Sequence, residues 1–172
     1  QDNIAGTNNT FLGRLSGTSN TASQNTYVGA YSGYTNTTGT GHVFIGYEAG
    51  KANTTGEDNV YLGHQAGTAS TTADYNVFIG SGAGLANTTG ARNVFIGRRN
   101  GESNTTGIYN TSVGGYTGQS NTTGYYNLFL GYRAGYNNTV ENHNSFIGAH
   151  SDGAVGVTNA TAIGYRAHVT QS

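Results

Sequence analysis

A phrase of about seventeen residues repeats along the chain, and it constrains the fold more than any other feature. Residues 76–92 read NVFIGSGAGLANTTGAR, and residues 93–109 read NVFIGRRNGESNTTGIY. One glycine closes the opening five letters of each copy, at intervals of 16 or 17 residues: Gly13, Gly29, Gly46, Gly63, Gly80, Gly97, Gly114, Gly131, Gly148 and Gly164. A period this short predicts a solenoid in which each repeat forms one coil.

The residue types within one repeat favour strands over helices. A repeat of this length cannot hold two packed helices, and segments rich in Val, Ile, Phe and Tyr between Gly and Asn are typical of short strands. We therefore predict an all-β fold, a parallel β-solenoid of ten coils of about 17 residues. Successive coils would stack about 4.8 Å apart. Because the repeat fills residues 1–172, we expect a single domain without a linker.

Two neighbouring columns of the repeat are apolar. The position before each reference glycine is always aliphatic, as in Ile79 and Ile96. The position before that is mostly aromatic: Phe11, Tyr27, Phe44, Tyr61, Phe78, Phe95, Phe129 and Phe146. Neighbouring side chains on a strand point to opposite faces. We expect the aliphatic column to form the core and the aromatic ladder to meet a second chain, the alternative being that the opposite wall of the coil covers the rings.

Asparagine and threonine also recur in fixed phase. An asparagine opens most copies, and we expect these residues to form a ladder: Asn25, Asn59, Asn76, Asn93, Asn110, Asn127 and Asn144. Asparagine suits corners because its amide satisfies nearby backbone groups, and stacked amides hydrogen-bond along a rod. A threonine stands eight residues after the reference glycine in eight copies, as in Thr88 and Thr105. Such a column would suit an ice-binding surface if it faced water.

The pattern N-[TV]-[FY]-[ILV]-G-x-x-[AS]-G-x-x-N-T-T-G resembles the repeats of bacterial head and tail-fibre-like surface proteins. These are similar to lengthened versions of the N-S-x-A-x-G repeats in the heads of trimeric autotransporter adhesins, and residues 159–172, NATAIGYRAHVTQS, follow that rhythm. The resemblance implies a left-handed parallel β-roll, three copies side by side, carried outside the cell on a fibre. The chain departs from the family in its longer coil and in the Phe or Tyr that replaces Ala.

Composition excludes several function classes. The net charge is −1 and 9% of residues are charged, so nothing favours nucleic acid as a partner. No apolar run approaches the ~20 residues of a membrane span. Without cysteine there is no disulfide or thiolate site. The histidines fall in different phases of the repeat and share no site: His42, His64, His143, His150 and His168. We expect no catalytic, cofactor or metal site, and no enzyme.

We therefore expect a non-enzymatic structural subunit of an extracellular fibre or adhesin-like appendage at a cell surface. It would associate with itself, as a homotrimer or a head-to-tail homopolymer. The alternatives are the receptor-binding part of a phage tail fibre and an ice-binding solenoid, and a host cell, glycan or other surface ligand is a further class of partner. The phrase stops in mid-repeat at both ends, which predicts that more protein covers the terminal coils.

Tyrosine and arginine gather in the C-terminal half, as in Tyr126 and Arg133. Both residue types are favoured in contacts between proteins. Stacking on neighbouring coils is the alternative role for them.

Overall fold

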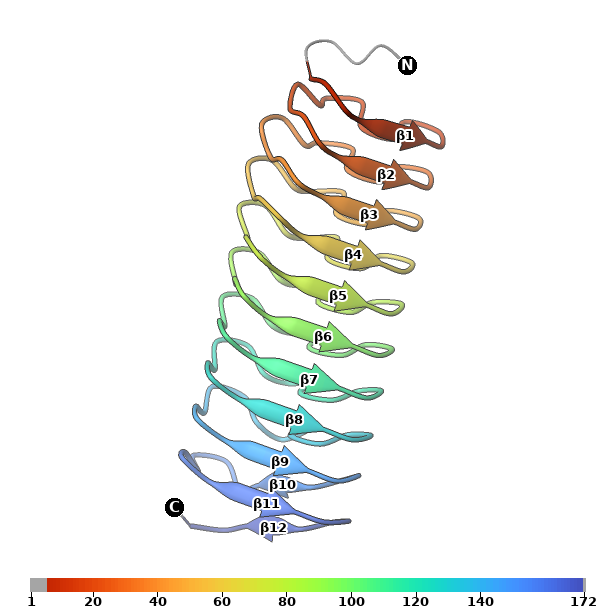
Figure 1. Cartoon of the computed structure of the whole chain (residues 1–172). Coiled ribbons are helices and arrows are strands. Elements are labelled where there is room, and N and C mark those ends of the chain that lie inside the picture. The colour runs from red at the N-terminus through yellow and green to blue at the C-terminus, as the bar shows by residue number, and fades with distance from the viewer. Residues whose placement is uncertain (1–5, 172) are drawn as a thin grey trace.

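The computed structural model describes residues 6–171 as an elongated stack of coils (Figure 1). Each coil contributes one three-residue strand to a single parallel sheet. The ten strands are β1 (Thr10–Leu12), β2 (Thr26–Val28), β3 (Val43–Ile45), β4 (Val60–Leu62), β5 (Val77–Ile79), β6 (Val94–Ile96), β7 (Thr111–Val113), β8 (Leu128–Leu130), β9 (Ser145–Ile147) and β11 (Thr161–Ile163). The predicted all-β parallel solenoid with about 17 residues per turn is confirmed.

A second, smaller sheet marks the C-terminal end of the stack. It pairs β10 (Asp152–Gly153) with β12 (His168–Val169), again in parallel. Figure 1 shows both strands beside the last rungs of the main sheet. Parts of the prediction about the chain ends fall on residues 1–5 and 172, outside the described residues.

The phase of the repeat sets the register of the sheet. Residues of equal phase are partners, so that Phe78 pairs with Phe95 and Ile79 pairs with Ile96. Backbone hydrogen bonds also join the coils outside the strands, as where Thr88 N donates to Thr105 O at 2.9 Å. Each coil therefore rests on the next around its whole circumference, which satisfies the backbone polar groups of the turns.

The expectation about which column forms the core was wrong. Tyr27, Phe44, Tyr61 and Phe78 are fully buried within the single chain, whereas the aliphatic column, including Ile79, points out of the coil and is half-buried or exposed. The opposite wall of the coil covers the aromatic ladder, as the alternative proposed. The rings therefore do not face a second chain, and an outward Ile79 or Ile96 does not belong to the core.

Ring geometry explains why the aromatic column lies inside. Phe78 stacks on Tyr61 and on Phe95 with ring centroids 4.9 and 5.0 Å apart and planes within 8° of parallel. This distance matches the spacing of neighbouring strands, so each coil that carries a ring extends the stack by one rung. The opposite wall makes room with glycine, since a Cβ on Gly84 would lie 2.5 Å from Cδ2 of Phe78.

Two corners of the coil carry non-glycine residues in the left-handed conformation. One lies two residues after the reference glycine, as in Arg99 (φ 50°), and the other precedes the opening asparagine, as in Arg92 (φ 58°). Gly82 and Gly41 take the same two slots in other coils with φ of 68° and 72°. The left-handed region costs about 1–2 kcal/mol for a residue with a Cβ, so the stacked neighbours must hold these corners in place.

Candidate functional site

The asparagines that open the rungs are brought together in one buried column. The amide oxygen of each accepts the backbone N–H of the next rung, as from Asn93 to Asn76 Oδ1 and from Asn110 to Asn93 Oδ1, both at 2.9 Å. The Nδ2 of Asn93 donates to Gly107 O at 2.8 Å. Buried amides with both polar atoms bonded are structural, because their hydrogen-bonding capacity is used within the chain.

A second amide column, with an asparagine seven residues after the reference glycine in most coils, lies beside the first, since Asn76 Nδ2 and Asn87 Nδ2 both donate to Gly90 O at 2.9 Å. Asn104 Nδ2 donates to Asn87 Oδ1 at 2.7 Å. In the preceding coil Ser70 takes the place of the asparagine, and Asn87 Nδ2 donates to its Oγ at 3.3 Å. The hydroxyl of Tyr61 donates a hydrogen bond to Ser70 Oγ at 3.0 Å. Burial raises the pKa of Tyr61 above its ordinary value, so this phenol is a neutral hydrogen-bonding group. Serine at position 70 therefore provides the hydrogen-bond acceptor for the hydroxyl of the buried Tyr61.

The aromatic ladder is interrupted once within the stack, and a polar pair fills the gap. Ser112 occupies the place of the ring, and its Oγ donates to Oδ1 of Asn100 at 2.7 Å, a position held by Ala, Ser or Thr in the neighbouring coils. Asn100 Nδ2 also donates to Gly114 O at 2.8 Å. The apolar interior is therefore divided into two clusters, one ending at Phe95 and the other beginning at Phe129.

His42 replaces the asparagine of the opening column and is fully buried. Its Nδ1 accepts the backbone N–H of Asn59 at 3.2 Å, which continues the ladder, and its ring stacks on Phe44 at 4.5 Å. Burial lowers the pKa of His42 to about 4, against 6.5 for an ordinary histidine, while hydrogen bonds with the backbone of Gly56 and Asn59 oppose that shift. The folded chain therefore holds this imidazole neutral at pH 7.

We expect His42 to make the protein less stable in acid. Between pH 6.5 and 4 the unfolded chain binds a proton that the folded chain does not bind, so the free energy of unfolding falls as the pH falls. The loss is about 3 kcal/mol from pH 7 to pH 4. His42→Asn, which restores the residue of neighbouring rungs, should remove it. Urea unfolding of both proteins at the two pH values measures the difference, and parallel pH profiles would contradict the prediction.

The outer face of the ten-stranded sheet carries two columns without a single charged residue. One is Thr10, Thr26, Val43, Val60, Val77, Val94, Thr111, Leu128, Ser145 and Thr161. The other is Leu12, Val28, Ile45, Leu62, Ile79, Ile96, Val113, Leu130, Ile147 and Ile163. We call these two columns the outer strip. Leu62 and Val113 are 41% and 40% exposed in the middle of the rod, so the strip is open to solvent along its length.

Exposed aromatic and basic side chains stack along the left-handed corners. Arg92 Cζ lies 5.1 Å from the ring centre of Tyr75 and 5.5 Å from that of Tyr109. Tyr109 stacks on Tyr126 at 4.8 Å, and Tyr126 stacks on His143 at 5.4 Å. Of the two roles considered for the tyrosines and arginines, the structure shows the contact with neighbouring coils. Such pairs stabilise the corners by roughly 0.5–1 kcal/mol each.

The threonine column, considered as an ice-binding surface if it faced water, is engaged in hydrogen bonds within the chain. Thr88 Oγ1 donates to Thr105 O at 3.0 Å, and Thr105 Oγ1 donates to Thr122 O at 3.1 Å. The same bond recurs from coil to coil, so the hydroxyl donors of this column hold successive coils together. Sequence reasoning placed these residues in one line but did not reveal that bond.

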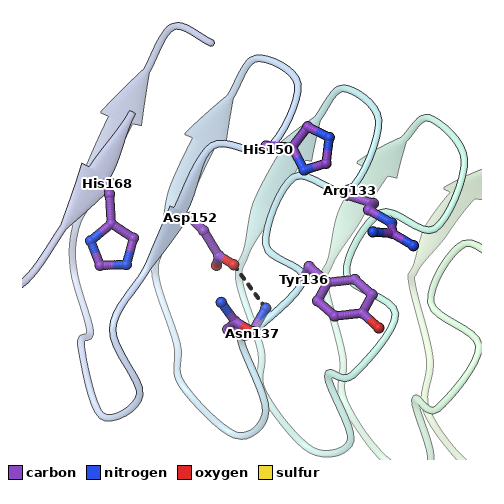
Figure 2. Close-up of a pocket in the computed structure, with 6 residues that line it drawn as sticks. All are labelled: Arg133, Tyr136, Asn137, His150, Asp152 and His168. Carbon is purple, nitrogen blue, oxygen red and sulfur yellow. Dashed lines mark hydrogen bonds between the residues drawn. The ribbon is translucent and has the colours of Figure 1, made fainter. Parts of the chain in front are cut away.

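A polar pocket of 190 Å³ lies at the C-terminal end, and sequence reasoning missed it (Figure 2). Its lining residues are Arg133, Tyr136, Asn137, His150, Asp152 and His168. Burial raises the pKa of the Asp152 carboxyl, although the backbone N–H groups of Asn137 and Gly153 and the nearby His168 oppose the shift. Three coils contribute these side chains, which occupy four different phases of the repeat, so no single column contains the whole pocket.

Across residues 6–171, no group of three or more His, Asp or Glu side chains is arranged to hold a metal ion. The same part of the chain contains no helix that is long and apolar enough to cross a bilayer. Comparisons of the chain with protein-family models, with curated proteins and with solved structures found no match, so the geometry carries the functional argument.

Proposed function

We propose that this protein is a non-enzymatic structural subunit of an extracellular fibre or adhesin-like surface appendage, built by side-by-side association of identical chains. The observation that carries the proposal is the outer strip. It replaces the aromatic ladder as the surface for self-association, because the rings are buried inside each chain.

The composition of the outer strip argues for a covered surface. Rungs such as Val77–Ile79 and Val94–Ile96 present two aliphatic side chains each, and the strip continues over ten rungs. At about 4.8 Å per rung it extends roughly 43 Å. Soluble monomers rarely expose continuous apolar surfaces of this kind. A second copy offers a partner with the same spacing of rungs and the same absence of charge, so two strips would match along their length.

The direction of the outer strip selects the mode of association. It runs along the stack, so chains that cover it lie next to one another and leave the ends of the coils free. The interior amide ladder joins successive coils, and the ring stack joins the coils on either side of its break at Ser112, which suits a stiff element. The extracellular and cell-surface placement is supported by the resemblance of the repeat to the bacterial surface proteins named above.

The expected result is that the native protein has a mass that is a multiple of the 17.8 kDa of one chain. Ile79→Lys combined with Ile96→Lys should reduce it to single chains, because two charges would have to leave water at the interface. Both side chains point out of the coil, so the circular dichroism spectrum should be retained. Sedimentation equilibrium measures the mass.

The matched control places lysines on the same two coils at Thr89 and Thr106, which are exposed on a different side. This variant should keep the native mass. A native protein that sediments as one chain at every concentration tested would refute the proposal, and so would equal dissociation of both double variants.

A further inference from the structure

The pocket of Figure 2 arises where the glycine column of the repeat ends. In eight coils a glycine stands four residues after the reference glycine, and in the last two coils Asp152 and His168 take that slot. These two residues are register partners of β10 and β12. Gly153, one residue later, takes up the position against the ring of Phe146, where a Cβ would lie 2.9 Å from Cζ. The shift by one residue turns Asp152 away from the ring stack.

Several polar groups converge on the pocket with unused hydrogen-bonding capacity. The Asp152 oxygens accept the backbone N–H groups of Asn137 and Gly153, both at 2.9 Å, and each oxygen keeps a further acceptor site. The Nε of Arg133 is buried without a hydrogen-bond partner. Among the hydrogen bonds of residues 6–171, none engages the side chains of Asn137, His150 or His168.

Arg133 is held in place by rings rather than by an acid. Its Cζ lies 5.2 Å from the ring centre of Tyr136, 5.5 Å from that of Tyr132 and 5.9 Å from that of Tyr116. No salt bridge joins it to another described residue. The guanidinium group is therefore held in place by the rings, while its N–H groups remain available as hydrogen-bond donors. Unpaired donors of this kind in a pocket favour a ligand that supplies acceptors.

Size and charge restrict the class of ligand. A volume of 190 Å³ is below the ~300–1,000 Å³ of sites for drug-sized ligands and cofactors. One arginine and one carboxylate line the pocket, so the formal charges of Arg133 and Asp152 sum to zero. A phosphate or sulfate would have to lie beside the Asp152 carboxylate in a partly desolvated site, which is unfavourable. A small neutral molecule that both donates and accepts several hydrogen bonds satisfies all of these groups.

We propose that this pocket binds one neutral pyranose unit of a glycan. Hydroxyl groups of the sugar would donate to Asp152 and accept from Arg133 and the imidazoles, and the ring of Tyr136, which is 37% exposed, would lie against its C–H groups. No residue of the pocket belongs to the outer strip, so the site stays open when chains lie side by side. Failure of self-association would leave the proposal untouched.

The histidines provide a direct test. The chain has five, so the ring Hε1 resonances of His150 and His168 can be assigned with His150→Gln and His168→Gln. The native protein is titrated with the methyl glycosides of glucose, galactose, mannose and N-acetylglucosamine, and separately with inorganic phosphate. At least one glycoside should shift both resonances and leave that of His64 in place, since His64 stacks on Tyr47 elsewhere on the rod.

Variants then identify the contacts. Tyr136→Ala and Asp152→Asn should weaken binding of that glycoside at least tenfold, whereas Tyr109→Ala, a 40% exposed tyrosine on another corner, should not change it. If Asp152→Asn unfolds, the exposed Tyr136 decides. The proposal is overturned if no glycoside shifts the two resonances, if phosphate alone shifts them, or if Tyr136→Ala binds like the native protein.

Discussion

Replacing Phe78 with alanine is expected to lower the free energy of unfolding by about 3–5 kcal/mol. Its ring is fully buried and lies between those of Tyr61 and Phe95, with centroids 4.9 and 5.0 Å away. Removing it leaves a gap that the rigid neighbouring rungs cannot close, since their backbones are bonded to each other around the coil. Urea unfolding followed by circular dichroism measures the loss.

The matched control is Ile79→Ala, one residue further along the same strand. Ile79 points outward and is half-buried, so this change should cost only about 1 kcal/mol in a single chain. Since the outer strip is proposed to be an interface, the comparison is made on the Ile96→Lys background, after sedimentation equilibrium has shown that this variant is a single chain. Equal losses for the two variants would contradict the assignment of the interior.

Gly97→Ala is expected to prevent the native stack from forming, or to reduce its stability by about 3 kcal/mol or more. Gly97 has φ of 137°, where an L-residue is strained, and an added Cβ would lie 2.6 Å from the carbonyl carbon of Gly114 in the next coil. That atom belongs to the backbone and cannot rotate away. The coils would have to separate at this corner, which breaks the bond from Gly114 N to Ile96 O at 2.8 Å.

Gly115→Ala serves as the comparison for this change. Gly115 follows the reference glycine of the next coil and lacks a positive φ, and its nearest non-neighbouring atom, Cδ2 of Tyr132, would lie 3.7 Å from the added Cβ. Its stability should stay close to that of the native protein, or rise slightly because alanine restricts the unfolded chain. Comparable thermal unfolding of the two variants would show that the reference glycines are not required by contact between coils.

The period of the sequence was sufficient to predict the coil, the rungs and the register. Phases translate directly into columns, so Asn76, Asn93 and Asn110 had to stack once the repeat became a solenoid. The side of the strand that faces inward did not follow from the same pattern. An alternation of two apolar residues has no polar face, and the more uniform aliphatic column was mistaken for the core.

The glycine column could have indicated which side of the strand faces inward. Glycine stands four residues after the reference glycine, in the coils with rings such as Phe44 and Phe78, because the ring needs that space. The break at Ser112 also shows why the interior column varies. A gap inside a coil is filled by a polar partner from the neighbouring coil, here Asn100, whereas a gap in the outer strip has no such local remedy.

The pocket lay beyond sequence reasoning for a different reason. Its residues come from three coils and four phases of the repeat, and the second sheet that turns Asp152 outward forms only where the glycine column ends. The histidines fall in different phases of the repeat, but Asp152 and His168 share one phase, which the search for a common site among histidines alone did not reveal. The side chains of the pocket come together because the chain leaves the regular repeat at β10 and β12.

The polar pair at the interruption of the ring stack also limits how such a rod can change its length in evolution. Loss of residues 59–75 would remove Tyr61 together with its partner Ser70 and leave no orphaned side chain of that pair. Loss of residues 93–109 would remove Asn100, and the Ser112 hydroxyl would then lose its hydrogen-bond partner, because Ala83 holds the equivalent position in the preceding coil. Both deletions remove one repeat, but only the first removes both partners of its buried polar pair. The backbone therefore allows any single coil to be gained or lost, whereas side-chain pairs that join two coils require both coils to be gained or lost together.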